Sequence, residues 1–167
     1  MPAARPSSCS APARVARQAA PAGPDGWVRQ AGPGDAGDVA ALLDVLGYPC
    51  SRDEAADRIA LVQGDRRQVL LLAETAGQVE GLVALETLYS IAHGSELARI
   101  TALVVAPGCE RRGVGRRLLR AVERRARQAG ISRIEVTSNA RRDGAHAFYR
   151  TCGYADGSLR FVKLLGD

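Results

Sequence analysis

The first regular pattern along the chain is a short apolar run followed by residues at helical spacing. Residues 27–29, Trp-Val-Arg, predict an opening strand that a Gly-Pro-Gly sequence ends. Between Ala36 and Leu46 the apolar side chains recur three and four residues apart, which predicts an amphipathic helix. We expect Asp35 to be the N-cap of this helix and Gly47 to be its stop.

A second helix and a pair of strands are predicted next. Ser51 and Glu54 form a capping-box pattern, and apolar residues at helical spacing continue from there to Gly64. Gln68–Thr75 and Val79–Tyr89 are two β-type runs separated by a short turn that contains glycine. Two such runs joined by a short turn predict an antiparallel hairpin.

The rest of the chain alternates strand and helix patterns. Leu97–Val105 becomes apolar on both faces towards its end, as expected of a central strand. Gly113–Ala129 has the clearest helical pattern, with one apolar face and one face rich in arginine. A strand at Ile131–Ser138, a helix at Arg142–Thr151 and a last strand at Phe161–Leu165 complete the pattern. This order of elements predicts a single mixed α/β, or α+β, domain.

Length and composition agree with one globular domain. The chain has 167 residues, of which 46% are hydrophobic and 25% charged. No apolar run approaches the roughly 20 residues of a membrane-spanning helix, so we expect no membrane partner and a cytoplasmic protein by default. Residues 1–26 are rich in Ala, Pro and Ser without apolar periodicity, which predicts a disordered N-terminal extension before a domain at 27–167.

The charge of the chain favours an anionic ligand. The net charge of +5 comes almost wholly from arginine, because Lys163 is the only lysine. Aromatic residues make up only 4% of the chain, so it lacks the interleaved aromatics of a single-strand nucleic-acid binder. We therefore expect a phosphate-rich ligand and no nucleic acid. The four cysteines form no C-x-x-C pair, and no metal site is expected.

The most informative motif is a strand, a turn and a helix start. The apolar strand ends at Pro107, and Gly113-Val114-Gly115 opens the arginine-rich helix. A helix N-terminus presents backbone N–H groups and partial positive charge, so it favours anions. Glycines also cap and pack helices, and this structural role explains a bare G-x-G equally well. The Walker pattern and G-x-G-x-x-G are absent, which excludes the usual ATPase and dinucleotide motifs.

Two motifs together resemble the Gcn5-related N-acetyltransferases, the GNAT family. The first runs from Leu103-Val104-Val105-Ala106-Pro107 to Gly113-Val114-Gly115-Arg116-Arg117-Leu118-Leu119, and the second from Ala145 to Tyr154. The element order from Trp27 to Leu165 also matches the family. The resemblance implies one GNAT-like domain, a mixed twisted sheet with helices on both faces, and acetyl-CoA as cosubstrate.

The resemblance also implies which residues hold acetyl-CoA. In the family the end of the central strand pairs with the pantetheine arm, and backbone N–H groups of the glycine turn hold the pyrophosphate. The matching pantetheine residues here are Leu103, Val104 and Val105. The matching pyrophosphate residues are Arg111, Arg112, Gly113, Val114, Gly115 and Arg116. Glu110 is a departure, because the family usually has Gln or Arg at that place, and we expect weaker binding at worst.

The predicted last helix carries a second candidate for chemistry. Tyr149 stands where the family commonly has a tyrosine that protonates the departing thiolate of CoA, which implies a catalytic acid. The alternative is that Phe148 and Tyr149 only pack this helix on the sheet. Arg142 stands where many members have Asn, and the local pattern resembles enzymes that acetylate aminoglycosides or aminoalkylphosphonates. Arg142 is assigned to a CoA phosphate, with a helix cap as the alternative.

An attacking amine needs a base, and Glu86 is the candidate by pattern. It interrupts the apolar face of a predicted strand, where an unpaired carboxylate is costly. The alternative is an ion pair between Glu86 and Arg99 on the neighbouring strand. Glu96 and His93 are other candidate bases, while His146 is assigned a structural role.

The resulting hypothesis is direct acetyl transfer from acetyl-CoA to a primary amine in a ternary complex.

 The acceptor is expected to be a small molecule, with peptide or protein amines as the alternative. A CoA-binding domain without catalysis and a nucleic-acid surface on the arginine helix are the rival functions. The sequence does not specify the oligomeric state, and a homodimer is among the states that it allows.

Overall fold

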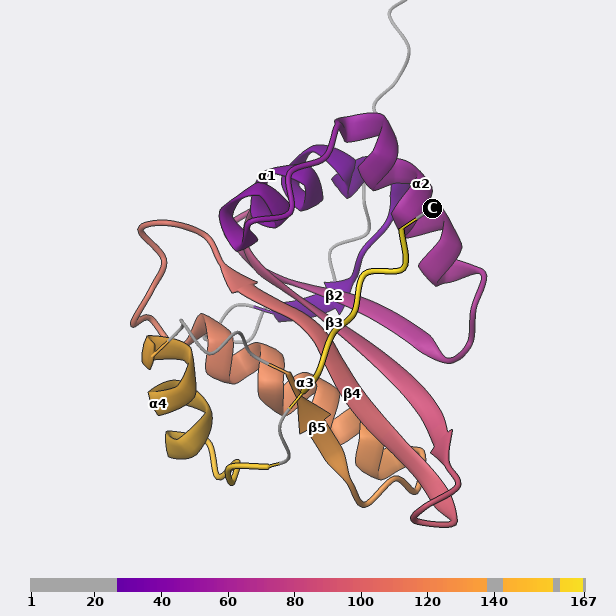
Figure 1. The fold of residues 1–167 in the computed structure, drawn as a ribbon. Coiled ribbons are helices and arrows are strands. Elements are labelled where there is room, and N and C mark those ends of the chain that lie inside the picture. The colour runs from indigo at the N-terminus through magenta and orange to yellow at the C-terminus, as the bar shows by residue number, and fades with distance from the viewer. Residues whose placement is uncertain (1–26, 138–142, 158–159, 167) are drawn as a thin grey trace, which may run out of the picture.

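The computed structural model describes residues 27–137, 143–157 and 160–166, and its element order follows the sequence pattern closely (Figure 1). The elements are β1 (Trp27–Gln30), the short 3₁₀ helix η1 (Pro33–Asp35), α1 (Ala36–Leu46), α2 (Arg52–Gln63), β2 (Gln68–Thr75), β3 (Gln78–Ser90), β4 (Ser95–Val105), α3 (Val114–Gln128), β5 (Ile134–Val136) and α4 (Asp143–Thr151). The predicted extension at residues 1–26 and the candidate Arg142 lie outside the described residues.

The five strands form one mixed sheet in the order β1-β2-β3-β4-β5. The first three pairings are antiparallel, and β4 pairs with β5 in parallel. The predicted hairpin and the mixed sheet are therefore confirmed. Of the strand expected at Ile131–Ser138, the described residues 131–137 form a strand only at Ile134–Val136, which pair with β4, and Ser138 lies outside the described residues.

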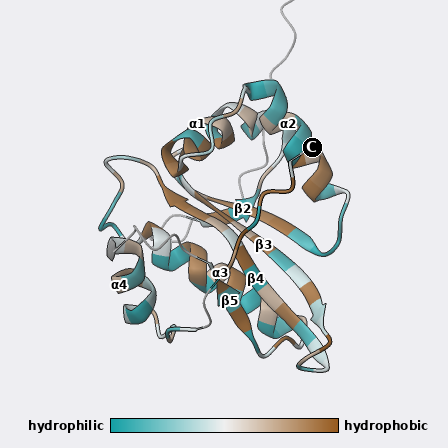
Figure 2. Ribbon diagram, in the orientation of Figure 1, coloured by the Kyte–Doolittle hydropathy of each residue, from teal (hydrophilic) through white to brown (hydrophobic). Residues whose placement is uncertain are grey.

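Helices cover both faces of the sheet, as expected (Figure 1). On one face α1 and α2 bury Val39, Leu42 and Ile59 against the sheet residues Leu72 and Leu82. On the other face, α3 buries a stripe against β2, β3 and β4, and α4 packs at its edge. Figure 2 shows apolar and polar segments alternating along α3, because one side of that helix faces the core and the other carries arginines.

The helix ends follow the predicted signals with one exception. Gly47 ends α1 in the left-handed region, and Ser51 and Glu54 make both hydrogen bonds of the capping box at α2. Asp35 is the N-cap residue of α1, as predicted, but its side chain makes no capping hydrogen bond to this helix. Its buried carboxylate instead accepts hydrogen bonds from the backbone N–H of Gly32 and from the Arg29 guanidinium.

Gly81 allows α3 to lie close to the sheet. A Cβ at this position would be 2.7 Å from the carbonyl oxygen of Val104 and 3.1 Å from Leu118 Cδ1. The first atom belongs to the β4 backbone and the second to a fully buried side chain, so a larger residue would push β4 and α3 away from β3. The glycine in β3 therefore helps to set the position of the α3 N-terminus against the end of β4.

The predicted last strand at Phe161–Leu165 is wrong for this structure, in which residues 160–166 have no regular secondary structure. Phe161 and Leu165 are each 89% exposed. An apolar run becomes a strand only where a neighbouring backbone completes its ladder, and this run pairs with no described strand. Within the described part of the chain, every helix is too short or too polar to cross a membrane.

Candidate active site

Strands β4 and β5 pair over a short stretch and then separate. The parallel ladder joins Ala98–Ile100 to Ile134–Val136, and no described strand pairs with β4 on that side beyond Ile100. A register shift in the β3 ladder places Leu85 opposite Ile100 and Ala84 opposite Ala102, so Thr101 is the extra residue of a β-bulge. The last residues of β4 therefore present backbone hydrogen-bonding groups at an open edge.

The three candidate pantetheine residues lie in this open stretch. Leu103 and Val105 pack against the α3 side of the core, and Val104 packs against the α1 and α2 side. Their side chains are thus held by the two hydrophobic clusters, which fixes the backbone between them. Contact with pantetheine stays a prediction, but the strand edge it requires is present in the fold.

A tight turn joins β4 to α3. The Cys109 N–H donates to the Ala106 carbonyl at 3.0 Å, and the Gly108 N–H donates to the Glu110 carboxylate at 2.7 Å. Arg111 has a φ of 60° and Gly113 a φ of 78°, both in the left-handed region. Glycine adopts this region without cost, whereas Arg111 is strained there.

The turn and the first residues of α3 present a row of backbone donors. In the described structure no backbone acceptor is recorded for the N–H groups of residues 110–116, and Arg117 is the first whose N–H bonds within the helix, to Gly113. Residues 111, 112, 113 and 116 are exposed. Donors in this arrangement, at the positive end of a helix dipole, favour an anion with several oxygens.

Two arginines near the turn are linked to a buried carboxylate that sequence reasoning missed. Glu80 is only 6% exposed and lies 3.0 Å from the Arg117 guanidinium and 3.5 Å from that of Arg112. The Thr75 hydroxyl donates to it at 2.8 Å. Glu80 could have been found from the sequence, because it interrupts the same alternation of apolar residues in β3 that pointed to Glu86. Glu80 thus helps to hold Arg112 beside the turn.

The α4 helix packs directly on the start of α3. A Cβ at Gly115 would lie 3.1 Å from Phe148 Cζ and 3.6 Å from Val105 Cγ2, so three elements meet at this glycine. Tyr149 is half-buried, and its ring makes an edge contact with Tyr154 at a centroid distance of 5.7 Å. The fold therefore brings the helix that carries Tyr149 to the end of β4, next to the turn.

The second tyrosine of this pair has its own carboxylate partner. The Tyr154 hydroxyl donates to the Glu123 carboxylate of α3 at 3.1 Å. Burial, and then the negative charge of Glu123, raise the pKa of Tyr154 above its usual value of 10. Tyr154 is thereby kept protonated and ties the end of α4 to α3.

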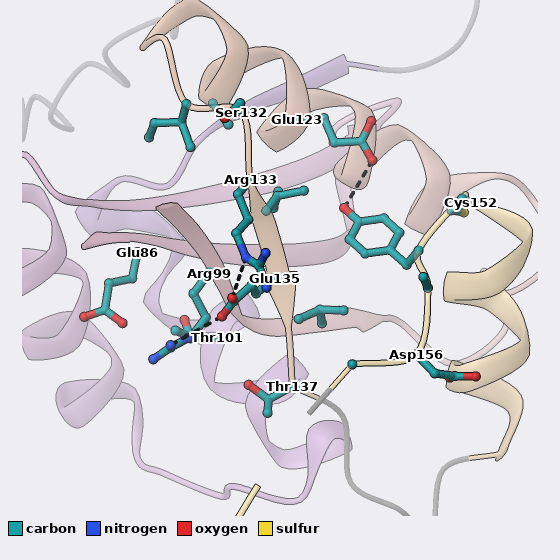
Figure 3. Close-up of a pocket in the computed structure, with 18 of the residues that line it drawn as sticks. Glu86, Arg99, Thr101, Glu123, Ser132, Arg133, Glu135, Thr137, Cys152 and Asp156 are labelled. Carbon is teal, nitrogen blue, oxygen red and sulfur yellow. Dashed lines mark hydrogen bonds and ion pairs between the residues drawn. The ribbon is translucent and has the colours of Figure 1, made fainter. Parts of the chain in front are cut away.

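A cavity of about 1080 Å³ surrounds β5, and Glu86 lines it. Figure 3 shows Glu86, Arg99 and Thr101 on one side of the strand that carries Glu135, with Glu123 and Cys152 on its other side. Arg99 pairs with Glu135 at 3.5 Å, so the alternative in which it pairs with Glu86 is not what the structure shows. Arg133 holds the same Glu135 at 3.0 Å, and the two arginines lower the pKa of this carboxyl, Arg133 more strongly.

The other candidate bases lie away from this cavity. His93 contacts the Ser90 hydroxyl in the turn between β3 and β4, and Glu96 is exposed at the start of β4. Glu96 and Val105 are separated by about 30 Å of strand at ~3.3 Å per residue. These two residues are therefore not brought to the open end of β4. Among the described residues, no group of His, Cys, Asp and Glu is placed to hold a metal ion.

Comparison with known proteins decides the family. The model of the acetyltransferase (GNAT) family matches residues 40–154, which include β4, the turn, α3 and α4. The chain belongs to the GNAT family. It is accordingly an acetyltransferase, and the resemblance found in its two sequence motifs is confirmed.

Curated relatives of this GNAT chain are N-acetyltransferases. An aminoalkylphosphonate N-acetyltransferase from Salmonella typhimurium is 33% identical over 124 residues, or 74% of this chain and 78% of the relative. An aminoglycoside N(6')-acetyltransferase type 1 from Stenotrophomonas maltophilia is 30% identical over 133 residues, or 77% of this chain and 86% of the relative.

Solved structures show the same fold. A GNAT family acetyltransferase from Staphylococcus aureus superposes with a TM-score of 0.71 at 23% identity, covering 83% of this chain and 98% of the other. An aminoglycoside 6'-N-acetyltransferase from Acinetobacter baumannii gives a TM-score of 0.70 at 20% identity, with the same two coverages. The single α+β domain with helices on both faces is therefore the GNAT fold.

Proposed function

We propose that this GNAT enzyme transfers the acetyl group of acetyl-CoA to the primary amine of a small molecule by direct attack in a ternary complex. The observation that carries the proposal is the row of backbone N–H groups at residues 110–116, directly beside the open edge of β4. One surface thus offers donors for a diphosphate and a strand edge for an extended amide chain.

The turn fits the pyrophosphate in chemistry as well as in shape. Residues 111, 112 and 116 are exposed arginines, which add positive charge to the backbone donors. The Glu110 carboxylate is occupied by the Gly108 N–H, so it lies at the beginning of the turn and acts as part of its internal structure. This explains how an acidic residue is accommodated next to an anion site.

The open edge of β4 fits the pantetheine arm. Pantetheine contains two amide groups, which can hydrogen bond to a strand backbone as a neighbouring strand would. Leu103, Val104 and Val105 are the residues whose backbone would make these bonds, because they lie beyond the ladder with β5. Arg142 is proposed to bind a phosphate of CoA on sequence grounds alone, since it lies outside the described residues.

Acetyl-CoA would supply the activated thioester, and the side chains supply the proton transfers. Glu86 takes a proton from the substrate ammonium, so that the freed nitrogen lone pair can attack the thioester carbonyl and form the new N–C bond. A backbone N–H at the open edge of β4, which begins after Ile100, stabilises the negative charge that develops on the carbonyl oxygen. As the C–S bond breaks, Tyr149 donates its phenolic proton to sulfur. No cysteine nucleophile is needed.

The acceptor is proposed to be a small molecule because both curated relatives are named for small amines, an aminoalkylphosphonate and an aminoglycoside. The cavity that Glu86 lines has the size of a small-molecule site. Cytoplasmic location and a homodimer stay predictions, and the catalytic proposal depends on neither.

The test is release of free CoA thiol from acetyl-CoA when amines are added. We expect thiol release that requires a small primary amine, with an acetylated product of matching mass. A peptide panel with free N-termini and lysines serves as the comparison. Faster turnover of peptides would contradict the small-molecule assignment, and CoA binding without turnover of any amine would support a domain that has lost catalysis.

A further inference from the structure

The cavity beside β5 contains a carboxylate and a guanidinium that face the same space without pairing. Glu86 and Arg99 are register partners on the antiparallel strands β3 and β4. Directly opposite residues point to the same face of a sheet, with Cβ atoms about 4.5–5.5 Å apart. Both line the cavity, and Figure 3 shows their side chains on the same side of the strand that carries Glu135.

Arg99 retains most of its capacity to bind an anion. Its contact with the Glu135 carboxylate is long, at 3.5 Å, and the same carboxylate is held more closely by Arg133 at 3.0 Å. Two guanidinium groups therefore share one carboxylate, which leaves this cluster with one excess positive charge. The Arg99 side chain is 39% exposed, so its remaining N–H donors face the cavity and its solvent.

Glu86 is the complementary group. It is half-buried, and within the described residues no hydrogen bond or ion pair is recorded for it. A partly desolvated carboxylate gains most from a cationic partner, and a ligand ammonium would supply one. Thr101, the bulge residue of β4, lines the same cavity and adds a hydroxyl between the two charges and the open strand edge.

We propose that the acceptor is a short zwitterion, in which an oxyanion group binds Arg99 while the amine binds Glu86. This inference rests on the proposed function and names its substrate class. The oxyanion is a phosphonate or a carboxylate, since either matches the guanidinium fork. The charged groups gathered around Arg99 are two arginines and two carboxylates, Arg99, Arg133, Glu135 and Glu86, and this balance suits a zwitterion better than a polycation, which would need an excess of acidic groups.

The experiment compares amines that share a chain and differ in the anionic group. Aminoethylphosphonate, β-alanine and ethylamine are assayed by thiol release, together with an aminoglycoside as a polycation. We expect kcat/KM for the better of the two zwitterions to exceed that for ethylamine by about 10- to 100-fold, the usual range for hydrogen bonds to a charged group. The two zwitterions distinguish a phosphonate site from a carboxylate site.

Two variants locate the effect at Arg99. Arg99→Gln should reduce the zwitterion-to-ethylamine ratio to near one, mainly through KM, and Arg99→Lys should restore part of it. Arg127→Gln is the matched control, because Arg127 lines the same cavity and loses the same charge from an exposed position. That control should keep the ratio, and melting curves check the folding of all three.

A wild-type ratio near one, a ratio unchanged in Arg99→Gln, or the highest kcat/KM for the aminoglycoside would overturn the proposal. Failure of every amine would instead contradict the proposed function. In that case the inference is tested separately by calorimetric titration, which measures the binding of aminoethylphosphonate and β-alanine to the CoA-bound protein. Binding that is lost in Arg99→Gln and kept in Arg127→Gln supports it, and any other pattern overturns it.

Discussion

The ring of Phe148 lies against Gly115, so closely that a Cβ on the glycine would be 3.1 Å from Phe148 Cζ. This contact joins α4 to the first turn of α3 and to Val105 at the end of β4. It places the helix of the candidate acid beside the strand edge and the turn assigned to acetyl-CoA. Gly115 therefore allows this close packing of α4 on α3, in addition to any role in admitting a phosphate.

Gly115→Ala should destabilise the protein through this contact. The new Cβ would force the Phe148 ring to move, and overpacking of this kind costs about 1–3 kcal/mol. Gly37→Ala is the matched control, because Gly37 is also helical and has no atom within 4 Å of a built Cβ. We expect a lower Tm for the first variant and an unchanged or higher Tm for the second. Equal Tm changes would contradict the packing role.

Tyr149→Phe should separate chemistry from packing. If the hydroxyl protonates the leaving thiolate, kcat falls by roughly 10²- to 10⁴-fold while CoA affinity and Tm stay near wild type. Tyr154→Phe is the control, since its hydroxyl is already bound to Glu123. That variant should lose about 1 kcal/mol of stability and keep most of its kcat. A kcat of Tyr149→Phe within a few-fold of wild type, with chemistry limiting turnover, would contradict the acid role.

Glu86→Gln should lower kcat/KM by roughly 10²- to 10⁴-fold, because the variant can no longer accept a proton from the amine. Glu96→Gln serves as the comparison, as Glu96 lies on the same pair of strands at their far end. Steady-state thiol release at one fixed pH measures kcat/KM for both variants and for the wild type. An equal kcat/KM for the wild type and Glu86→Gln would show that another group, or water, is the base.

Tyr154 should make the protein sensitive to alkali. Its pKa is raised in the folded state, so the stabilising effect is complete below the unfolded value near 10 and is lost progressively at higher pH. Denaturant unfolding of the wild type and Tyr154→Phe across this range gives the measurement. We expect the stability difference between them to shrink as pH rises above about 10. A difference that stays constant or grows would contradict the assignment.

The sequence was most informative where structure depends on neighbours along the chain. The Ser51 and Glu54 capping box, the Gly47 stop and the arginine-rich α3 were all found from local spacing. The turn before α3 was likewise recognisable, because a strand, a glycine turn and an amphipathic helix follow each other directly. These features account for most of the predicted fold and for the placement of the candidate cosubstrate site.

The predictions that the structure contradicts all depend on contacts between residues that are distant in the sequence. Which carboxylate pairs with Arg99 is decided by the parallel neighbour β5, which places Glu135 within reach, and no local pattern shows that. Asp35 binds Arg29 because the first strand passes the start of α1. Phe161–Leu165 has the composition of a strand, but composition does not specify whether the edge of a sheet lies close enough to pair with it. Such outcomes follow from tertiary packing, which overrides local preference.

The most direct test of the account is calorimetric titration of CoA into three proteins. Gly113 and Gly130 stand at opposite ends of α3 with φ values of 78° and 76°, and neither has an atom within 4 Å of a built Cβ. Valine at either position therefore imposes similar backbone strain, but only Gly113→Val obstructs the turn. We predict that the wild type and Gly130→Val bind CoA alike and that Gly113→Val binds it at least about tenfold more weakly, a loss of about 1.4 kcal/mol. Equal affinity in all three proteins would contradict the assignment of the turn to acetyl-CoA.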